Sequence, residues 1–313
     1  MSGKAPRILA ADATALARAV RHLRMGEPVA VPTETVYGLA ARADDDAAVA
    51  GIYRAKGRPD FNPLIVHVGD LAQAERLAVF DARARLLAER FWPGPLTLVL
   101  PLREEAPVVA AVTAGLPTIA IRMPAHPVMR ALLAETGLPL AAPSANRSGG
   151  VSPTSAAHVA ASLGESIPLI LDGGPCEAGL ESTIVALREG GCWQILRPGP
   201  IVAEELAAIL GPPEEVGDAR IEAPGQLASH YAPGKPVRLD AQEAAPDEFM
   251  IGFGPVRGDI SLSETGDLGE AAARLYACLH SAASSDKPHI AIAPIPAGGI
   301  GDAINDRLKR AAA

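Results

Sequence analysis

The feature that most constrains the fold is the alternation of short apolar segments with amphipathic helical segments through the N-terminal part of the chain. The apolar segments have the length of strands, and the helical ones repeat their apolar residues at helical spacing. The two kinds follow one another without a strict βαβ repeat, which favours an α/β fold of the α+β kind, built on a mixed, twisted sheet. The predicted strands are 28–33, 63–68, 95–100, 117–124, 139–146, 167–174, 181–187 and 192–199, and the predicted helices are 12–26, 44–57 and 81–92.

A segment rich in glycine and proline divides the chain. Nine of the 26 residues in 211–236 are Gly or Pro, which is typical of a linker between domains. We therefore expect a large domain over 1–210, a linker over 211–236 and a small α/β domain over 237–313. In the small domain the pattern predicts strands at 249–254 and 289–295, and helices within 266–285 and 300–312.

Composition excludes several classes of protein. With 49% hydrophobic residues the chain can bury sizeable cores, yet no apolar run reaches the roughly 20 residues of a membrane span. The three cysteines are scattered without a CxxC pair, so neither a zinc ribbon nor a disulfide scaffold is expected. The start of the chain lacks the pattern of a secretory signal, and we expect a cytoplasmic location. A net charge of −8 and 4% aromatic residues disfavour avid binding to nucleic acid.

Polar loops at the ends of the predicted elements are the candidate binding segments, since strand ends are where such sheets usually place ligands. The P-loop, GxGxxG, HExxH and GxSxG motifs are absent, so the common nucleotide, zinc-protease and serine-hydrolase sites are not expected. The candidate loops are 32–38, 56–64 and 143–154.

Each of these loops has both a functional and a structural interpretation. The first carries two hydroxyls, a phenol and a carboxylate, from Thr33, Thr35, Tyr37 and Glu34, and it could equally be a capped turn. The second places Lys56 and Arg58 around a glycine, which suits phosphates but also suits capping of a helix C-terminus. The third is rich in Ser and Gly before a helix, where backbone N–H groups bind phosphate, although Ser152 or Thr154 could be an ordinary N-cap.

Single polar residues in or beside apolar strands add to this pattern. His67 could be a buried structural residue and Arg122 could form a buried ion pair, while Ser182 and Arg197 lie within later predicted strands. Together, cations and hydroxyls after successive strands favour an anionic, phosphate-bearing ligand.

Eight motifs occur here in the order found in the L-threonylcarbamoyladenylate synthases of the long, two-domain type, which this chain resembles. The resemblance extends over roughly residues 12–236 and weakens beyond, where GGIGDAINDRLKRA is still similar to the family's last helix. Ala40 stands where the family more usually has Gly. The motifs are PTETVYGL, KGRPDFNPL, FWPGPLT, RMPAHP, PSANRSGGVSPT, DGGPCEAGLESTIV, RPGPI and SHYAPGKP.

The resemblance implies a fold and a reaction. The catalytic domain would be YrdC-like, with a twisted sheet and a concave positive face, followed by a smaller Rossmann-like α/β domain. L-Threonine, bicarbonate and ATP would give threonylcarbamoyl-AMP and pyrophosphate, with Mg2+ bound to ATP and no acidic metal ligand singled out. A partner complex would pass the threonylcarbamoyl group to the adenosine beside the anticodon of tRNA. Neither membrane association nor strong direct tRNA binding is expected.

The resemblance also implies site residues. Lys56 and Arg58 would stabilise the triphosphate and its leaving group, and Arg122 would bind the threonine carboxylate, since a guanidinium binds a carboxylate through two parallel hydrogen bonds. The segment 229–234 is similar to the family's active-site lid. The implied ATP contacts are Arg58, Asn62, Thr118, Ser144, Ser152, Arg197 and Tyr231, and the implied threonine contacts are Thr35, Tyr37, His67, Arg122, Ala142 and Ser182.

Other functions remain open at this point. An RNA-binding module on the same fold would show salt-dependent RNA affinity without ATP. Carbamoyl or nucleotidyl transfer to a different acceptor, as in hydrogenase maturation, would be expected to come with acylphosphatase and zinc-finger segments, and three dispersed cysteines cannot supply the latter. A nucleotide-binding regulator without turnover is separated from these only by an activity assay.

Overall fold

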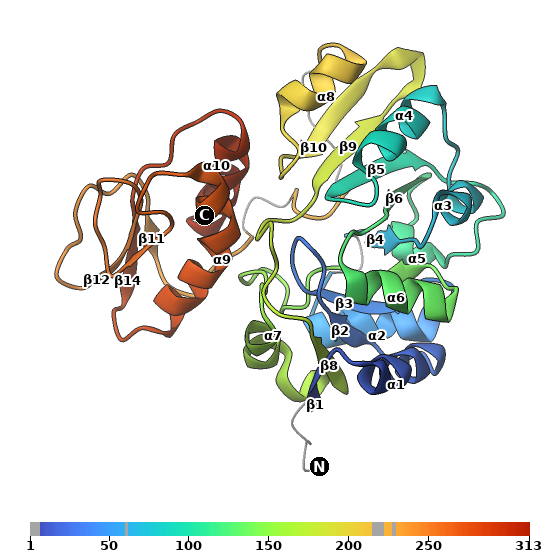
Figure 1. Cartoon of the computed structure of the whole chain (residues 1–313), viewed down its shortest axis with the longest axis horizontal. Helices are drawn as coiled ribbons and strands as arrows, with labels where there is room; N and C mark the ends of the chain where they lie inside the picture. The colour runs from blue at the N-terminus through green and yellow to red at the C-terminus, as the bar shows by residue number, and fades with distance from the viewer. Residues whose placement is uncertain (1–6, 60–61, 215–221, 227–229) are drawn as a thin grey trace.

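The computed structural model describes residues 7–59, 62–214, 222–226 and 230–313, which form a large mixed α/β domain and a smaller C-terminal α/β domain (Figure 1). Within these ranges, a ten-stranded sheet organises the large domain and a four-stranded sheet the small one. Parts of the expected linker, 215–221 and 227–229, lie outside the described residues, as does Ser229 at the start of the expected lid.

The large sheet mixes parallel and antiparallel pairs, as expected. Its strand order is β1-β8-β2-β3-β7-β4-β6-β5-β9-β10. The pair β4 and β6 is parallel, with His67 opposite Arg122 in the register. The strands are β1 Arg7–Ala10, β2 Val29–Val31, β3 Gly38–Arg42, β4 Ile65–His67, β5 Leu96–Pro101, β6 Thr118–Arg122, β7 Leu140–Ala141, β8 Leu169–Asp172, β9 Thr183–Leu187 and β10 Trp193–Arg197.

The helices of the large domain begin and end where local signals place them. The Asp12 carboxylate accepts a hydrogen bond of 2.8 Å from the Ala15 backbone N–H at the start of the first helix, as expected of an N-cap. The second helix ends at Gly57, whose φ of 59° is left-handed and suits glycine. The helices are α1 Ala13–Arg24, α2 Asp46–Lys56, α3 Leu71–Leu77, α4 Ala82–Phe91, α5 Ala110–Thr113, α6 Pro127–Thr136, α7 Ala156–Leu163 and α8 Ala203–Leu210, with short 3-10 turns at Gly164–Ser166 and Glu189–Gly191.

The C-terminal domain is the small α/β unit that its sequence predicts. Its sheet, in the order β11-β14-β12-β13, is parallel throughout, and long helices pack against it, as a parallel sheet requires. Within the described part of the chain, no helix is both long and apolar enough to cross a membrane. The elements are β11 Val237–Arg238, β12 Glu248–Gly252, β13 Ile260–Ser261, β14 His289–Ile292, α9 Leu268–Ser284 and α10 Ile300–Ala311.

Some predicted strands are shorter in the structure. The apolar run 63–68 forms a strand only over Ile65–His67. Segment 139–146, predicted as a strand running into a loop, is a strand only over Leu140–Ala141. The remainder of both runs is loop, and part of it lines the pocket described below. Apolar character therefore marks burial in these segments better than it marks strand length.

The small domain docks on the large one through α9 (Figure 1). Leu180 of the large domain belongs to the same buried apolar cluster as Leu275 of α9. At Gly179, with φ of 67°, a Cβ would lie 2.4 Å from the Ala273 carbonyl oxygen, so only glycine allows this approach. The two domains therefore share a core rather than only a linker.

A histidine pair crosses the same interface. The rings of His158 on α7 and His280 on α9 stack with centroids 3.9 Å apart, and His280 Nε2 lies 3.1 Å from the Ser152 carbonyl oxygen. Burial, and next the neighbouring His280, lower the pKa of His158 to about 4. Burial also lowers the pKa of His280. Both rings are therefore neutral at pH 7.

We expect acid to destabilise this interface. Because the folded-state pKa of His158 lies below its unfolded value, the unfolded chain binds more protons, and stability falls as pH drops from 6.5 to about 4. His158→Gln removes one titrating ring, so its melting temperature should depend less steeply on pH in this window, by a few degrees. Scanning calorimetry at pH 7.5, 6.0 and 5.0 measures this difference. Identical pH profiles for the two proteins would contradict the prediction.

Candidate active site

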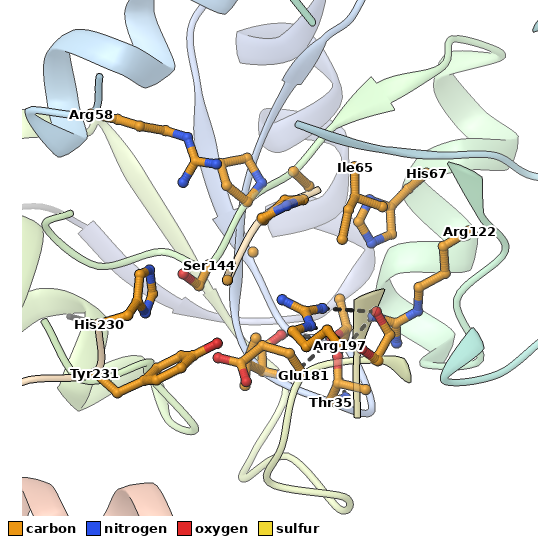
Figure 2. A pocket seen from close by; sticks show the side chains of 18 residues that line it. Thr35, Arg58, Ile65, His67, Arg122, Ser144, Glu181, Arg197, His230 and Tyr231 are labelled. Carbon is orange, nitrogen blue, oxygen red and sulfur yellow. Dashed lines mark hydrogen bonds between the residues drawn. The ribbon is translucent and has the colours of Figure 1, made fainter. Parts of the chain in front are cut away.

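A pocket lies at the strand ends of the large sheet, where polar side chains from distant segments converge (Figure 2). In Figure 2, His67 and Arg122 lie on one side of the pocket, and Arg58 and Tyr231 lie on the other. The lining residues are Thr33, Thr35, Val36, Gly38, Arg58, Ile65, His67, Arg122, Ala142, Pro143, Ser144, Glu181, Ser182, Arg197, Pro224, Gly225, His230 and Tyr231.

Arg122 organises one end of the pocket. It is 3% exposed and lies at the end of β6. Its Nε donates to the Gly94 carbonyl oxygen at 3.1 Å and its Nη1 donates to Thr35 Oγ1 at 2.8 Å. Its Nη2 lies 2.6 Å from a carboxylate oxygen of Glu34. Arg122 thus forms the buried ion pair that its structural interpretation predicts. It also lies in the pocket wall, which is compatible with its predicted role in binding a carboxylate.

His67 lies beside Arg122 because the parallel strands β4 and β6 end together. Burial, and next the charge of Arg122, lower the pKa of His67 to about 3. The ring is neutral at physiological pH, and its Nδ1 is buried without a hydrogen-bond partner among the described residues. Such an atom is suited to a polar ligand group, because an unpaired buried nitrogen is costly.

Arg197 and Arg58 supply two further cations. Arg197 Nη2 donates to Ser182 Oγ and its Nε to the Ser182 carbonyl oxygen, both at 3.1 Å. Arg58 Nη2 donates to the Pro63 carbonyl oxygen at 2.9 Å. Burial lowers the pKa of both groups, that of Arg58 only to about 10, so Arg58 stays cationic at pH 7. Arginine side chains in general keep their charge in proteins. Two fixed guanidinium groups in one pocket form an anion-binding surface.

Residues that follow the large domain close the pocket. His230 and Tyr231 line it, and Tyr231 Oη is buried without a hydrogen-bond partner among the described residues. In Figure 2 this hydroxyl points into the pocket. Gly225 lies close to Tyr231 and to Arg197, since a Cβ there would be 3.1 Å from Tyr231 Oη and 2.9 Å from Arg197 Cδ.

Nine of the residues predicted from the sequence meet in this pocket. Ser144 lines it and donates to Asn146 Oδ1 at 2.6 Å, while Ala142 presents the adjoining stretch of chain. The nine are Thr35, Arg58, His67, Arg122, Ala142, Ser144, Ser182, Arg197 and Tyr231.

Five predicted residues do not line the pocket. Lys56 is buried and donates to the carbonyl oxygens of Ser144 and Asn146, at 2.5 and 2.6 Å, so it ties α2 to the loop that lines the pocket. Burial, and next the charge of Arg58, lower the pKa of Lys56 well below its usual value. Tyr37 points away and donates to the Gly174 carbonyl oxygen at 2.8 Å.

The other three have different neighbours. Ser152 is buried and donates to Glu181 Oε1 at 2.5 Å, which places it directly behind a lining residue. Asn62 is buried beside Arg58, whose Nε donates to the Asn62 carbonyl oxygen at 3.2 Å. Thr118 begins β6 and Arg122 ends it, which separates the two by about 13 Å at the usual rise of a strand.

Three polar residues of the pocket were not predicted as substrate contacts: Thr33, Glu181 and His230. Each stands next to or near a predicted contact, within the motifs PTETVYGL, ESTIV and SHYAPGKP. Glu181 had no signal of its own, because a carboxylate is not expected in a pocket for anions.

Models of two protein families match the chain. The model described as telomere recombination, of the Sua5, YciO and YrdC proteins, matches residues 21–199. The model of the threonylcarbamoyl-AMP synthase C-terminal domain matches residues 201–313. The chain is 42% identical to the threonylcarbamoyl-AMP synthase of Bacillus subtilis, over 95% of this chain and 92% of the relative.

The chain belongs to the threonylcarbamoyl-AMP synthase family. It is therefore an enzyme, a nucleotidyltransferase that forms threonylcarbamoyl-AMP. It is 48% identical to the threonylcarbamoyl-AMP synthase of Pyrococcus abyssi over 69% of this chain and 64% of that protein. A crystal structure of Pyrococcus abyssi Sua5 complexed with L-threonine superposes with a TM-score of 0.86 at 38% identity, covering 95% of this chain and 94% of that one. The two-domain Sua5-like fold is thereby confirmed.

No group of three or more metal-ligating side chains occurs within the part of the chain that the structure describes. The pocket's charged side chains are mostly cations, with Glu181 as the lining carboxylate. This donor set suits phosphate and carboxylate groups and does not suit a resident divalent cation.

Proposed function

We propose that this pocket binds L-threonine against Arg122 and ATP against Arg58 and Arg197, and joins them through bicarbonate. The observation that carries the proposal is the separation of Arg58 and Arg122 on opposite sides of one pocket, with Arg197 between them (Figure 2). Threonine offers one carboxylate and ATP offers a triphosphate, so two distinct anion sites fit the two substrates. The Pyrococcus abyssi relative that was crystallised with L-threonine supports the assignment of one site to this amino acid.

At the Arg122 end, the guanidinium would bind the threonine carboxylate. Its Nη groups already hold Thr35 and Glu34, so its orientation is fixed before the substrate arrives. The unpartnered Nδ1 of neutral His67 can accept a hydrogen bond from the threonine amine. Ser182 and the backbone at Ala142 complete the predicted threonine contacts.

The chemistry needs no nucleophilic side chain. The neutral threonine amine attacks the carbon of CO2 or bicarbonate and forms a carbamate. From CO2 this step releases a proton, and from bicarbonate it releases water instead. A carbamate oxygen then attacks the α-phosphorus of ATP, the bond to the β,γ-phosphates breaks, and pyrophosphate leaves. Positioning and charge stabilisation supply the catalysis. Arg58 would stabilise the departing pyrophosphate, and Arg197 would hold the phosphates.

Tyr231 and His230 lie over the nucleotide end of the pocket. A carbamate and an acyl-adenylate are both hydrolysed by water, so a covering segment would protect them. Ser144 stays a predicted ATP contact that lines the pocket. Ser152, Asn62 and Thr118 stay predicted contacts away from its wall, and we assign Lys56 to holding the loop that carries Ser144.

The magnesium of this reaction would arrive bound to the triphosphate as part of the substrate. The product would be passed to a separate complex that transfers the threonylcarbamoyl group to tRNA. The expected cytoplasmic location stays a prediction.

The decisive experiment measures pyrophosphate release from ATP by the purified chain, with and without L-threonine and bicarbonate. We expect release to require both co-substrates, and labelled bicarbonate to enter a product that also contains AMP and threonine. Release without threonine would mean transfer to another acceptor. ATP binding without any release would contradict turnover and favour a regulator.

A further inference from the structure

The carboxylate of Glu181 joins the pocket to the C-terminal domain. It is buried, with 6% of the residue exposed, and it lies two residues before the start of β9. Its Oε2 accepts hydrogen bonds from Tyr276 Oη at 2.7 Å and from Arg307 Nε at 3.0 Å. Its Oε1 accepts one from Ser152 at 2.5 Å. Two of its three partners therefore come from α9 and α10 of the other domain.

This carboxylate is a potential competitor of the substrates. It lines a pocket that also contains Arg58, Arg122 and Arg197. Burial opposes its ionisation, but the charge of Arg307 and then that of Arg197 outweigh burial and lower the pKa of Glu181 to about 2. It is therefore an anion at neutral pH. A buried anion in a pocket for phosphates attracts the same guanidinium groups that the phosphates need.

In the structure Glu181 pairs with Arg307 and leaves Arg197 bound to Ser182. Arg307 is fully buried on α10, outside the pocket wall, and is held in place by Asp306 at 2.8 Å. Its guanidinium also lies 5.4 Å from the centroid of the Tyr231 ring. A buried guanidinium is costly to desolvate, so its position behind the pocket makes it a candidate for a functional role.

We propose that Arg307 is a positioning residue for the reaction: together with Tyr276 it holds the Glu181 carboxylate toward the C-terminal domain and so keeps Arg197 available to ATP. The proposal rests on the proposed function in one respect, the assignment of Arg197 to the nucleotide. It gives the C-terminal domain a task in catalysis, because α9 and α10 supply the two groups that set the direction of a side chain in the pocket wall.

The test replaces Arg307 by methionine, which keeps most of the volume and removes the charge. Glu181 then faces Arg197 as its nearest cation, so we expect the KM for ATP to rise roughly 10- to 100-fold while the KM for L-threonine stays nearly constant. Arg307→Lys should recover much of the loss. Tyr276→Phe, which removes one donor to Glu181, should shift the KM for ATP in the same direction by less.

A second variant separates positioning from mere docking of the domains. In Arg307→Met with Glu181→Gln, the competing anion is gone, and we expect the KM for ATP to return toward the wild-type value. Lys309→Met, an exposed cation on the same helix, is the matched control and should change neither constant. Melting temperatures show whether each variant is folded. A double variant as impaired as Arg307→Met, or equal loss of affinity for both substrates, would overturn the proposal.

Arg197→Met distinguishes failure of this proposal from failure of the nucleotide assignment. If Arg197→Met raises the KM for ATP and Arg307→Met does not, the role of Arg307 is refuted alone. If Arg197→Met leaves the KM for ATP unchanged, the assignment of Arg197 is wrong and the proposal falls with it. A rise in both variants, with recovery in the double variant, supports the proposal.

Discussion

Arg122→Lys is expected to raise the KM for L-threonine roughly 100-fold, because a hydrogen bond to a charged group commonly contributes about 1.5–3 kcal/mol and lysine cannot replace both bonds of the guanidinium. Lysine keeps the positive charge opposite Glu34 and can still donate to Thr35, so the fold should tolerate it. It cannot present two parallel N–H groups to a carboxylate. The loss should therefore fall on threonine and leave the KM for ATP within a few-fold of the wild-type value.

Pyrophosphate release at varied threonine and at varied ATP measures both constants. Arg18→Lys, on the exposed face of α1, is the matched control for an arginine-to-lysine change and should alter neither. If the KM values for threonine and ATP rise together, Arg122 stabilises the shape of the whole pocket and does not bind threonine selectively. An unchanged KM for threonine would mean that another group binds the carboxylate.

Some helices with clear local signals were predicted from the sequence, whereas α3 with its Asp70 N-cap and α6 with its Gly137 C-cap were missed. Asp12 caps α1 and Gly57 ends α2 as expected, because capping depends on residues within a single turn. By contrast, β3 was missed. Its residues, Gly38–Arg42, are mostly small and include no β-branched side chain. They form a strand because they pair with β2 and β7 on either side. Pairing between distant segments carries no local signal.

The same distinction holds for the site. His67 and Arg122 could be singled out because each is a polar residue in an apolar strand, and the parallel register then brings them together. The direction of Tyr37 could not be predicted, since its hydroxyl is bound by the backbone at Gly174, far along the chain. Glu181 is explained only by Arg307, its partner across the domain interface. Charges that are paired over such distances become interpretable only in three dimensions.

Arg58→Ala should have the largest effect on turnover. Arg58 lies at the end of the pocket that we assign to the nucleotide, and the carbonyl oxygens of Asn62 and Pro63 hold its guanidinium in place. Burial lowers its pKa, but only to about 10, so it remains a cation where, in the proposed reaction, pyrophosphate would develop charge. Removing one such preorganised group typically lowers kcat by about 100- to 1,000-fold. The affinity for threonine should change little, because we assign threonine to the other end.

Single-turnover pyrophosphate release and calorimetric titration with threonine separate the two effects. Arg58→Lys should lie between the wild type and alanine, since an ammonium supplies charge without the fixed fork of donors. If Arg58→Ala lowers the affinity for threonine by as large a factor as it lowers kcat, Arg58 supports the shape of the pocket rather than the leaving group. If kcat is unchanged, Arg58 does not stabilise the leaving group. The stabilising charge would then be that of Arg197, beside Ser182, rather than that of Arg58 after the end of α2.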